Sequence, residues 1–318
     1  MLHVIANPAS HSGTGAGRIK KLTRQLEKEH LDFCLHMTTG KGNAGTIVST
    51  LSLTSEDQLL LSGGDGSMNE LISGLSLPCP ADVLLFPSGS GNDFARGMKI
   101  SKELEDLIPF LDRQAAVPSR NIDLGQVTSF PSKESSSHAL KDKRFCVSCG
   151  FGMDAATCDA LETGKLKSIC NRLHIGKLSY LIVGIRTILQ TGKDKRAAVK
   201  VTADGKTVRF RNTVFLSVHN LPYEGGGFPF APEASPEDGI LDVCVIHVPS
   251  RFLMLPMLAA CLLGGRHTAF RHFCTSIRCK TITVSSDRPM PLHTDGEVVR
   301  DQMGFTAAVL PGVLKCRQ

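Results

Sequence analysis

Residues 59–72 constrain the fold of this chain more strongly than any other segment. Three leucines, at 59 to 61, pass through Ser62 into Gly-Gly-Asp-Gly, and Ser67 then opens a stretch with helical character. Glycines let a backbone approach a bound group closely, and a helix N-terminus adds N–H donors and a positive dipole. A tight turn alone would account for one glycine but not for three around an aspartate. We therefore expect this strand-to-helix turn to hold a phosphate.

The first third of the chain alternates short apolar stretches with amphipathic ones. Strands are predicted at 2–6, 33–37, 58–61 and 83–86, and helices at 18–30 and 44–53. A further helix carries Leu104, Leu107, Ile108 and Leu111 and should be capped by Ser101. This alternation is typical of a parallel sheet covered by helices on both faces.

Two more turns rich in glycine and serine follow predicted strands, at 7–17 and 87–95. Either turn alone is a weak signal, because such turns are common between elements. Ligands of parallel sheets bind beyond the carboxyl ends of the strands, where all three turns fall. Together they predict one nucleotide pocket.

The pattern changes near 121–127. A polar, serine-rich stretch at 129–143 reads as an exposed hairpin loop, and stretches of period two then predict strands at 197–202, 207–210, 213–218, 241–248 and 281–284. Helices are expected at 153–162 and 177–189. We predict an α/β chain in which residues 1–122 form a parallel α/β domain and residues 123–302 an antiparallel β-sandwich. Residues 303–318 are expected to pack back on the first domain.

Composition narrows the class of protein further. Of the 318 residues, 42% are apolar and 21% charged, which suits a packed globular chain of two domains. There is no Trp and there are two Tyr, so we expect no nucleic-acid partner that depends on stacked bases. The net charge of +6 suits phosphates or an anionic lipid surface, but many other proteins share it.

The cysteines and the termini bear on location. Eleven cysteines are scattered without paired spacing, which predicts reduced thiols in a cytoplasmic protein. The pair Cys146 and Cys149 reads as small buried side chains rather than a metal or redox motif. No basic segment followed by a long apolar core is visible near Met1, so no signal peptide is expected. The apolar run 252–263 is too short to span a bilayer.

The glycine-rich segments resemble the catalytic domain of the diacylglycerol kinase family, which includes bacterial lipid kinases and is related to sphingosine and ceramide kinases. The family motif Gly-Gly-Asp-Gly-Thr-x-Asn-Glu is read here at 63–70 with Ser67 for Thr, and Pro-x-Gly-Thr-x-Asn-Asp at 87–93 with Ser90 for Thr. Further matches lie at 123–125, 150–154, 234–242 and 293–297. The resemblance covers nearly the whole chain and implies an active site in the cleft between the two domains.

The resemblance implies a set of ATP contacts, in which His11 stands where the family often has glycine. Serine in place of threonine at 67 and 90 keeps the hydroxyl. The implied nucleotide-binding residues are Asn7, Pro8, Ala9, Ser10, His11, Thr38, Gly63, Gly64, Asp65, Gly66, Ser67, Met68, Asn69, Ser90 and Asn92.

Carboxylates supply the implied chemistry. Phosphoryl transfer needs a proton acceptor and Mg²⁺ to spread phosphate charge. We assign Glu297 as the acceptor, with Asp65 and Asp295 positioning the metal–phosphate group and the hydroxyl. The alternative for Asp295 and its neighbours is an ordinary Asp-Gly hairpin turn.

A second Mg²⁺ site is the other implied feature. The resemblance places it at Ser235, Asp238 and Ile240. Mg²⁺ with few protein ligands and several waters is chemically sensible. A plain turn before a strand explains this segment equally well.

These expectations describe an ATP- and Mg²⁺-dependent lipid kinase, with diacylglycerol as the default acceptor and phosphatidic acid as its product. The alternatives are a kinase of NAD or a sugar phosphate, and a non-catalytic nucleotide-binding regulator. The partner would be lipid at the inner membrane surface, reached by peripheral contact. The run 252–263 could touch that surface or lie buried, and an edge of the second sheet could pair in a homodimer.

Overall fold

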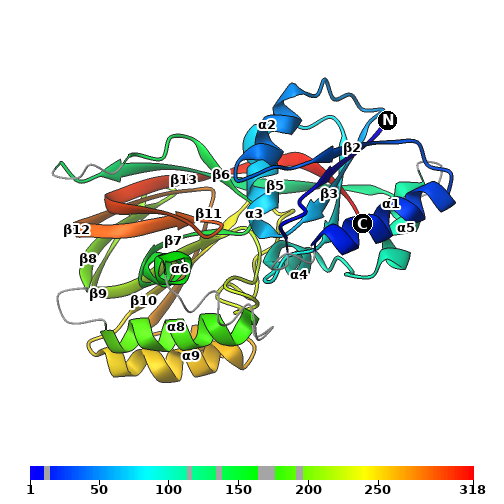
Figure 1. Cartoon of the computed structure of the whole chain (residues 1–318). Coiled ribbons are helices and arrows are strands. Elements are labelled where there is room, and N and C mark those ends of the chain that lie inside the picture. Colours follow the sequence, from blue (N-terminus) through cyan, green and yellow to red (C-terminus); the bar gives the residue numbers. More distant parts are fainter. Residues whose placement is uncertain (11–14, 113–116, 134–137, 164–175, 191–195) are drawn as a thin grey trace. The chain divides into compact units, whose positions relative to one another are not determined.

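A computed structural model of the chain describes residues 1–10, 15–112, 117–133, 138–163, 176–190 and 196–318 (Figure 1). It divides into two compact units. Unit 1 comprises Met1–Leu124 together with Pro311–Gln318, and unit 2 is the continuous segment Gly125–Leu310. Two long strands, β5 (Ser119–Pro131) and β13 (Glu297–Arg317), belong partly to each unit.

Unit 1 is built on a parallel sheet in the order β2-β1-β3-β4, continued by the end of β13 beside β4. The carboxyl ends of its strands are in register, since Ala6 pairs with Met37 and with Ser62, and Gly63 pairs with Pro87. The turns that follow these strands therefore share one edge of the sheet. The elements are β1 (Leu2–Ala6), α1 (Gly15–Lys28), β2 (Phe33–Met37), α2 (Asn43–Thr50), β3 (Gln58–Gly63), α3 (Asp65–Gly74), β4 (Asp82–Pro87), α4 (Asp93–Met98) and α5 (Leu104–Leu111).

Helical spacing explains how α1 and α5 cover this sheet. Ile19, Leu22 and Leu26 of α1 recur at intervals of three and four residues, and all are buried against the sheet. The α5 leucines that were expected to pack, at 104, 107 and 111, are buried in the same cluster. The predicted α/β architecture of the first half is confirmed.

The helix bounds differ from the predictions for local reasons. After α1 the chain turns at His30, whose φ of 56° is left-handed, and the helix therefore ends at Lys28. The expectation that Ser101 caps α5 is wrong, because the N-cap is Glu103. The Ser101 hydroxyl lies before the helix, where it accepts the Glu103 N–H and donates to the Asp106 carboxylate in the first turn of α5.

Unit 2 is an antiparallel sheet domain, as expected. β9 pairs with β7, β8 and β10, β10 pairs with β11, and β12 pairs with β7, β8 and β13. The predicted strands 207–210 and 213–218 are one strand in the structure. The elements are β6 (Lys143–Phe145), β7 (Ser148–Gly152), α6 (Met153–Thr163), α8 (Gly176–Gln190), β8 (Ala197–Ala203), β9 (Lys206–His219), β10 (Leu241–His247), η3 (Arg251–Leu253), α9 (Met254–Leu262), η4 (Arg266–Ala269), β11 (Cys274–Cys279) and β12 (Thr281–Thr294).

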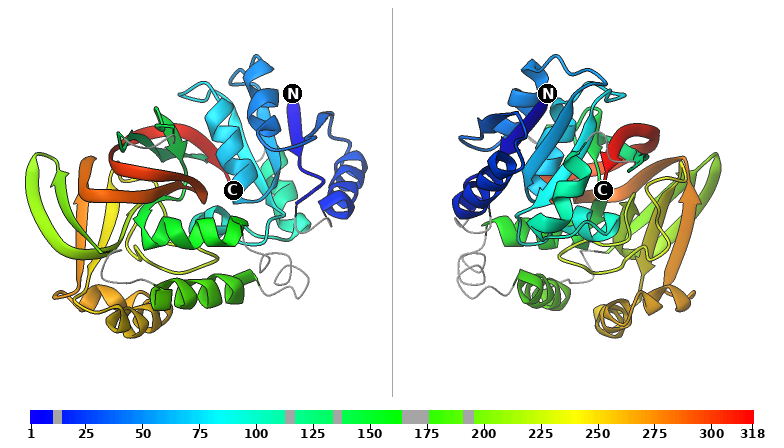
Figure 2. Two further views of the ribbon diagram at one scale, coloured as in Figure 1. Left: turned by 60° about the vertical axis from the view of Figure 1, so that its left-hand side comes forward. Right: turned by 90° about the vertical axis from the view of Figure 1, so that its right-hand side faces the viewer.

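Two apolar clusters hold unit 2 together. Aromatic side chains such as Phe151 and Phe305, whose ring centroids are 5.7 Å apart, lie between its strands. Phe215, Met254 and Met257 belong to a second cluster, where helices cover the sheet. Helices α8 and α9 run side by side at this face (Figures 1 and 2).

The apolar run 252–263 becomes η3 and α9. Met254, Met257 and Cys261 of α9 point into the core, which agrees with a buried helix. The two ends of the run are not buried, because Phe252 is 59% exposed and Leu263 is 66% exposed. Among the described residues, no helix combines the length and the apolar character that crossing a membrane would require.

Candidate active site

The three glycine-rich turns of unit 1 are joined by side-chain hydrogen bonds. Asn7, directly after β1, donates from Nδ2 to Ser67 Oγ at 3.0 Å. The hydroxyls of Ser10 and Ser88 lie 3.0 Å apart and link the first turn to the third. The Asp65 carboxylate accepts the Phe94 N–H at 3.0 Å, which ties the start of α3 to α4. The turns therefore form one structure, which we call the cradle (residues 7–10, 63–67 and 88–94).

Two glycines of the cradle, Gly64 and Gly89, pack backbone against backbone. A Cβ placed on Gly64 would lie 2.7 Å from Gly89 Cα, and one on Gly89 would lie 2.6 Å from Gly64 Cα. Real Cβ atoms do not approach backbone so closely, so only glycine fits at both positions without a shift of the backbone. This packing brings the second and third turns together.

Gly66 is different, because it is exposed and a Cβ there would meet no atom within 4 Å. It lies in the first turn of α3, where Gly64 is the N-cap and supplies no side-chain hydrogen bond to the helix. The first N–H groups of a helix then remain suited to an anion. Open space at a glycine beside such a helix end fits a phosphate group.

Asn92 shapes the third turn rather than reaching out of it. It is 4% exposed, with Oδ1 accepting the Gly89 N–H at 2.9 Å and Nδ2 donating to the Gly89 carbonyl at 2.7 Å. Asp93 pairs with Arg96, which also donates to the Gly91 carbonyl at 3.1 Å. Ser90, between these residues, is exposed.

The other predicted nucleotide contacts fall into different environments. Thr38 is buried and its N–H donates to the Ala6 carbonyl, while Ala9 N–H donates to Asn7 Oδ1. The structure does not agree with a nucleotide contact by Met68. Its side chain is 1% exposed and its N–H donates to the Gly64 carbonyl, so neither can bind a phosphate. Asn69 is equally buried. His11 lies outside the described residues.

The predicted catalytic carboxylates of unit 2 lie on the β12–β13 hairpin. Asp295 and Gly296 both have positive φ, 46° and 89°, which is typical of a type I′ turn built from Asp-Gly. The Asp295 carboxylate accepts the N–H groups of Cys146, Val147 and Ser148 at 2.8 to 3.1 Å. Asp295 therefore anchors the turn, which is a different task from positioning substrate.

Glu297 follows this anchored turn. It pairs with Thr294 across the hairpin, and its carboxylate lies 3.7 Å from Lys143 Nζ. Its side chain is 32% exposed, so solvent or a ligand can reach it. A partly exposed carboxylate on a rigid hairpin is suited to accept a proton.

Sequence reasoning missed a buried polar group beneath this turn. His293 Nε2 lies 3.0 Å from Asp154 Oδ2 and 3.3 Å from Glu224 Oε1, and Nδ1 accepts the Gly296 N–H at 3.2 Å. Asp154 and His293 fall inside the segments 150–154 and 293–297 that were noted for resemblance. Glu224 belongs to no motif and could not have been found that way.

Electrostatics couples the members of this group. Burial alone would lower the pKa of His293, but Cys158 and the carboxylates of Asp154 and Glu224 outweigh it and raise the pKa well above its usual value. Burial raises the pKa of Glu224, and the charge of Asp154 adds to the rise. The folded group therefore holds protons strongly.

A small pocket of about 60 Å³ adjoins the group and lies within unit 2. Asp154 and Glu224 stand at its wall, and most of its other lining is apolar. The apolar lining comes from Met153, Ile188, Phe215, Phe228, Phe230 and Leu258.

The residues predicted as a second Mg²⁺ site do not fit that ion. Asp238 forms an ion pair with Arg278 and also accepts the Ile240 N–H at 3.1 Å. A guanidinium already occupies the carboxylate that the metal would need. Ser235 and Asp238 belong to the turn before β10, which was the alternative interpretation.

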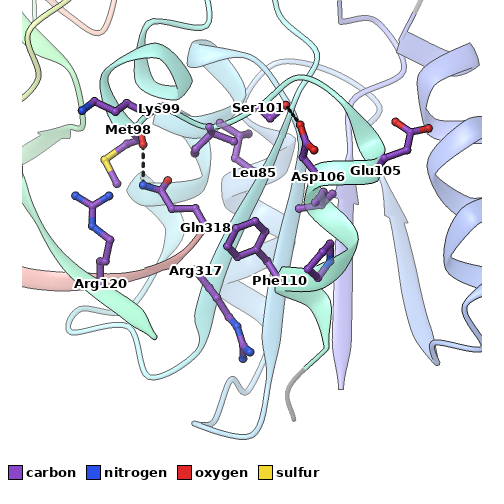
Figure 3. A pocket seen from close by; sticks show the side chains of 13 residues that line it. Leu85, Met98, Lys99, Ser101, Glu105, Asp106, Phe110, Arg120, Arg317 and Gln318 are labelled. Carbon is purple, nitrogen blue, oxygen red and sulfur yellow. Dashed lines mark hydrogen bonds between the residues drawn. The ribbon is translucent and has the colours of Figure 1, made fainter. Parts of the chain in front are cut away.

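Unit 2 also contains a cavity of about 520 Å³, and unit 1 contains one of about 580 Å³. Figure 3 shows the latter, with Gln318 donating to the Met98 carbonyl and Ser101 to Asp106. It lies between α5, the α4–α5 segment and the chain end at Arg317. Its lining residues differ from all the predicted nucleotide contacts.

Comparison with known protein families matches most of the chain. The family model of the diacylglycerol kinase catalytic domain matches residues 1–127, and that of the YegS C-terminal NAD kinase beta sandwich-like domain matches residues 148–317. The Bacillus subtilis protein named "Putative lipid kinase YtlR" is 26% identical over 298 residues, which cover 93% of this chain and 92% of that protein.

Two further relatives carry a more specific name. The diacylglycerol kinase of Bacillus subtilis is 26% identical over 299 residues, 92% of this chain and 88% of that protein. A crystal structure of a diacylglycerol kinase from Bacillus anthracis superposes with a TM-score of 0.68 at 17% identity, covering 99% of this chain and 96% of that one, and so shares the fold. The chain belongs to the diacylglycerol kinase family of lipid kinases, with the family's catalytic domain followed by a YegS-type β-sandwich domain.

Proposed function

We propose that this protein transfers the γ-phosphate of ATP to a lipid hydroxyl, with diacylglycerol as the acceptor. The cradle carries the proposal: three turns at one sheet edge are hydrogen-bonded together around a helix start with open space at Gly66. Phosphoryl transfer depends mainly on holding the phosphates and stabilising their charge.

In this proposal, residues of unit 1 bind the ATP phosphates and a residue of unit 2 accepts the proton. The cradle, with Ser67, Asp65 and the first turn of α3, would hold the ATP phosphates. Glu297 would accept the proton of the lipid hydroxyl, and Asp295 would keep the Glu297 turn in place. Mg²⁺ bound with ATP would spread the developing phosphate charge.

Diacylglycerol is favoured as acceptor by the names of the relatives. Relatives that align over most of the chain are named diacylglycerol kinases.

A lipid acceptor implies contact with a bilayer, which we propose is made by exposed apolar side chains at the ends of α9. Phe252, Leu262 and Leu263 are between 48% and 66% exposed. Replacing Leu262 and Leu263 by serine should reduce sedimentation with phosphatidylglycerol-containing vesicles. Val208→Ser, at an equally exposed strand position of unit 2, is the matched control. Equal sedimentation of both variants would contradict the proposal.

Radiolabelled ATP tests the function directly. The purified chain with MgATP and mixed vesicles containing diacylglycerol should give label in the organic phase, at the position of phosphatidic acid. Parallel reactions contain NAD or a sugar phosphate in place of the vesicles. Label that appears only on those acceptors would reject the lipid proposal, and absence of label on every acceptor would favour a non-catalytic regulator.

The Glu297→Gln variant assigns the base in the same assay. General base catalysis contributes roughly 10²- to 10⁴-fold, so the turnover number should fall by about that factor. Melting temperature should stay close to that of the wild type, because Glu297 is partly exposed. Turnover within a few-fold of the wild type would remove Glu297 from the mechanism.

A further inference from the structure

A second group of reactive side chains lies in unit 2, apart from the residues assigned to phosphoryl transfer. Cys244 comes from β10, His267 from η4 and Cys274 from the start of β11. All three are at most 2% exposed, and their sulfur and nitrogen atoms lie within 4.8 Å of one another. Three elements of the segment 241–279 thus direct two thiols and an imidazole at one point.

The spacing of these atoms matches the edges of a zinc tetrahedron. Cys244 Sγ lies 3.8 Å from Cys274 Sγ and 3.6 Å from His267 Nε2. Zinc bonds of about 2.3 Å to sulfur and about 2.0 Å to nitrogen give tetrahedral edges of about 3.8 Å and 3.5 Å, so the three side chains could take up the ion with little movement.

We propose that Cys244, His267 and Cys274 bind a zinc ion, with the fourth position open to water from the cavity that Cys274 lines. Two cysteines, one histidine and a water form a known zinc coordination sphere. On binding, each thiol loses its proton to solvent and forms a sulfur–zinc bond, with no change of oxidation state.

The surroundings of His267 define how it would bind the ion. Its Nε2 can donate to the Phe230 carbonyl at 3.2 Å and lies 3.6 Å from Cys244 Sγ, while Nδ1 is buried and has no hydrogen-bond partner among the described residues. Coordination through Nε2 would replace the hydrogen bond to Phe230 and put the ring proton on Nδ1. The Gly265 carbonyl is the other backbone acceptor that acts on this ring, and ligand histidines usually donate to such a group.

An ion can reach this point. Cys274 lines the cavity of about 520 Å³, together with Thr268, Arg271 and Asp242. The other ligands lie behind it in the core, where Cys244 and Cys274 belong to the same apolar cluster as Met254 and Met257 of α9. Bound zinc would therefore fasten η4 to the β10–β11 edge.

Metal analysis tests the proposal, which does not depend on the kinase assignment. The full chain, purified under reducing conditions without chelator, should contain one zinc per molecule. Exchange for Co²⁺ should give the visible bands of a tetrahedral ion and a sulfur-to-cobalt charge-transfer band. A strong chelator should lower the melting temperature, and added zinc should restore it.

Variants assign the ligands. Cys244→Ala and Cys274→Ala should each lose the bound metal. Cys279→Ala replaces another buried cysteine of β11 and should keep one metal ion. Because the ligand variants could unfold, the Co²⁺ spectrum of the wild type stands as an independent measurement.

Three results would overturn the zinc site. One is reduced wild-type protein that binds neither Zn²⁺ nor Co²⁺ in stoichiometric amount. Another is loss of the metal from Cys279→Ala to the same extent as from Cys244→Ala. The third is a disulfide between Cys244 and Cys274 found by mass spectrometry in metal-free protein as isolated.

Discussion

Gly66 is the residue at which the phosphate proposal can be tested with the least disturbance to the fold. Its missing side chain leaves space, and alanine is the better helix former by roughly 0.5–1 kcal/mol. Gly66→Ala should therefore keep or raise the melting temperature. If a phosphate uses that space, the methyl group should weaken ATP binding at least tenfold, as measured by calorimetry.

Gly184→Ala is the matched control for this change. Gly184 lies inside α8 of unit 2, and a Cβ there meets no atom within 4 Å. ATP affinity should be the same as in the wild type. Unchanged affinity in Gly66→Ala as well would mean that the phosphates lie elsewhere.

Asp295 separates an anchoring role from a catalytic one. Asn adopts the left-handed conformation readily, so Asp295→Asn keeps the turn but sets an amide N–H against backbone donors. Hydrogen bonds to a charged group are worth roughly 1.5–3 kcal/mol, so the free energy of unfolding should fall by about that amount.

Activity distinguishes the two roles. For an anchor, the turnover number of Asp295→Asn should fall much less than that of Glu297→Gln, and stability should fall with it. A large loss of turnover at wild-type stability would restore Asp295 to the chemistry. Glu233→Gln, at an exposed position of unit 2, is the control for removing a negative charge.

At the scale of elements, the hairpin of β12 and β13 is coupled to α6 through the buried group of His293, Asp154 and Glu224. The folded-state pKa of His293 lies well above 6.5. Its contribution to stability is therefore complete below pH 6.5 and is lost as the pH rises through the folded-state pKa.

Thermal unfolding between pH 6 and 9.5 measures this contribution. The melting temperature of the wild type should decline with rising pH more steeply than that of His293→Gln, because the glutamine side chain at position 293 does not titrate. His272→Gln, at an exposed histidine of the same unit, should keep the wild-type slope. Parallel slopes in all three proteins would show that His293 is not protonated in the fold.

The elements differ in how far sequence predicts them. Strands β1 to β4 were predictable because each is a short apolar run ended by glycine or polar turn residues. The role of Asp295 was not, because its partners at 146–148 lie far away along the chain. Scattered cysteines carried no zinc-like spacing, and only the pairing of β10 with β11 brings Cys244 near Cys274.

At the scale of the molecule, the last eight residues belong to unit 1. Leu314 of β13 is fully buried there, and Gly312 N–H donates to Asp123 at 2.7 Å. Leu314→Ala should cost roughly 2–5 kcal/mol, as for a leucine in the middle of a core. Leu35→Ala, at a 39% exposed position of the same unit, should cost much less in the same urea titration. Equal costs would mean that the segment contributes little.

The continuity of unit 2 has a consequence for how such proteins can diversify. Residues Gly125–Leu310 form one uninterrupted insert, entered along β5 and left along β13, whereas unit 1 is assembled from two separate stretches. A single exchange of that insert between relatives would transplant the whole unit that we propose to bind the acceptor and leave the cradle unchanged. Both seams fall within strands, so a successful graft must conserve strand register at two places rather than the length of a loop.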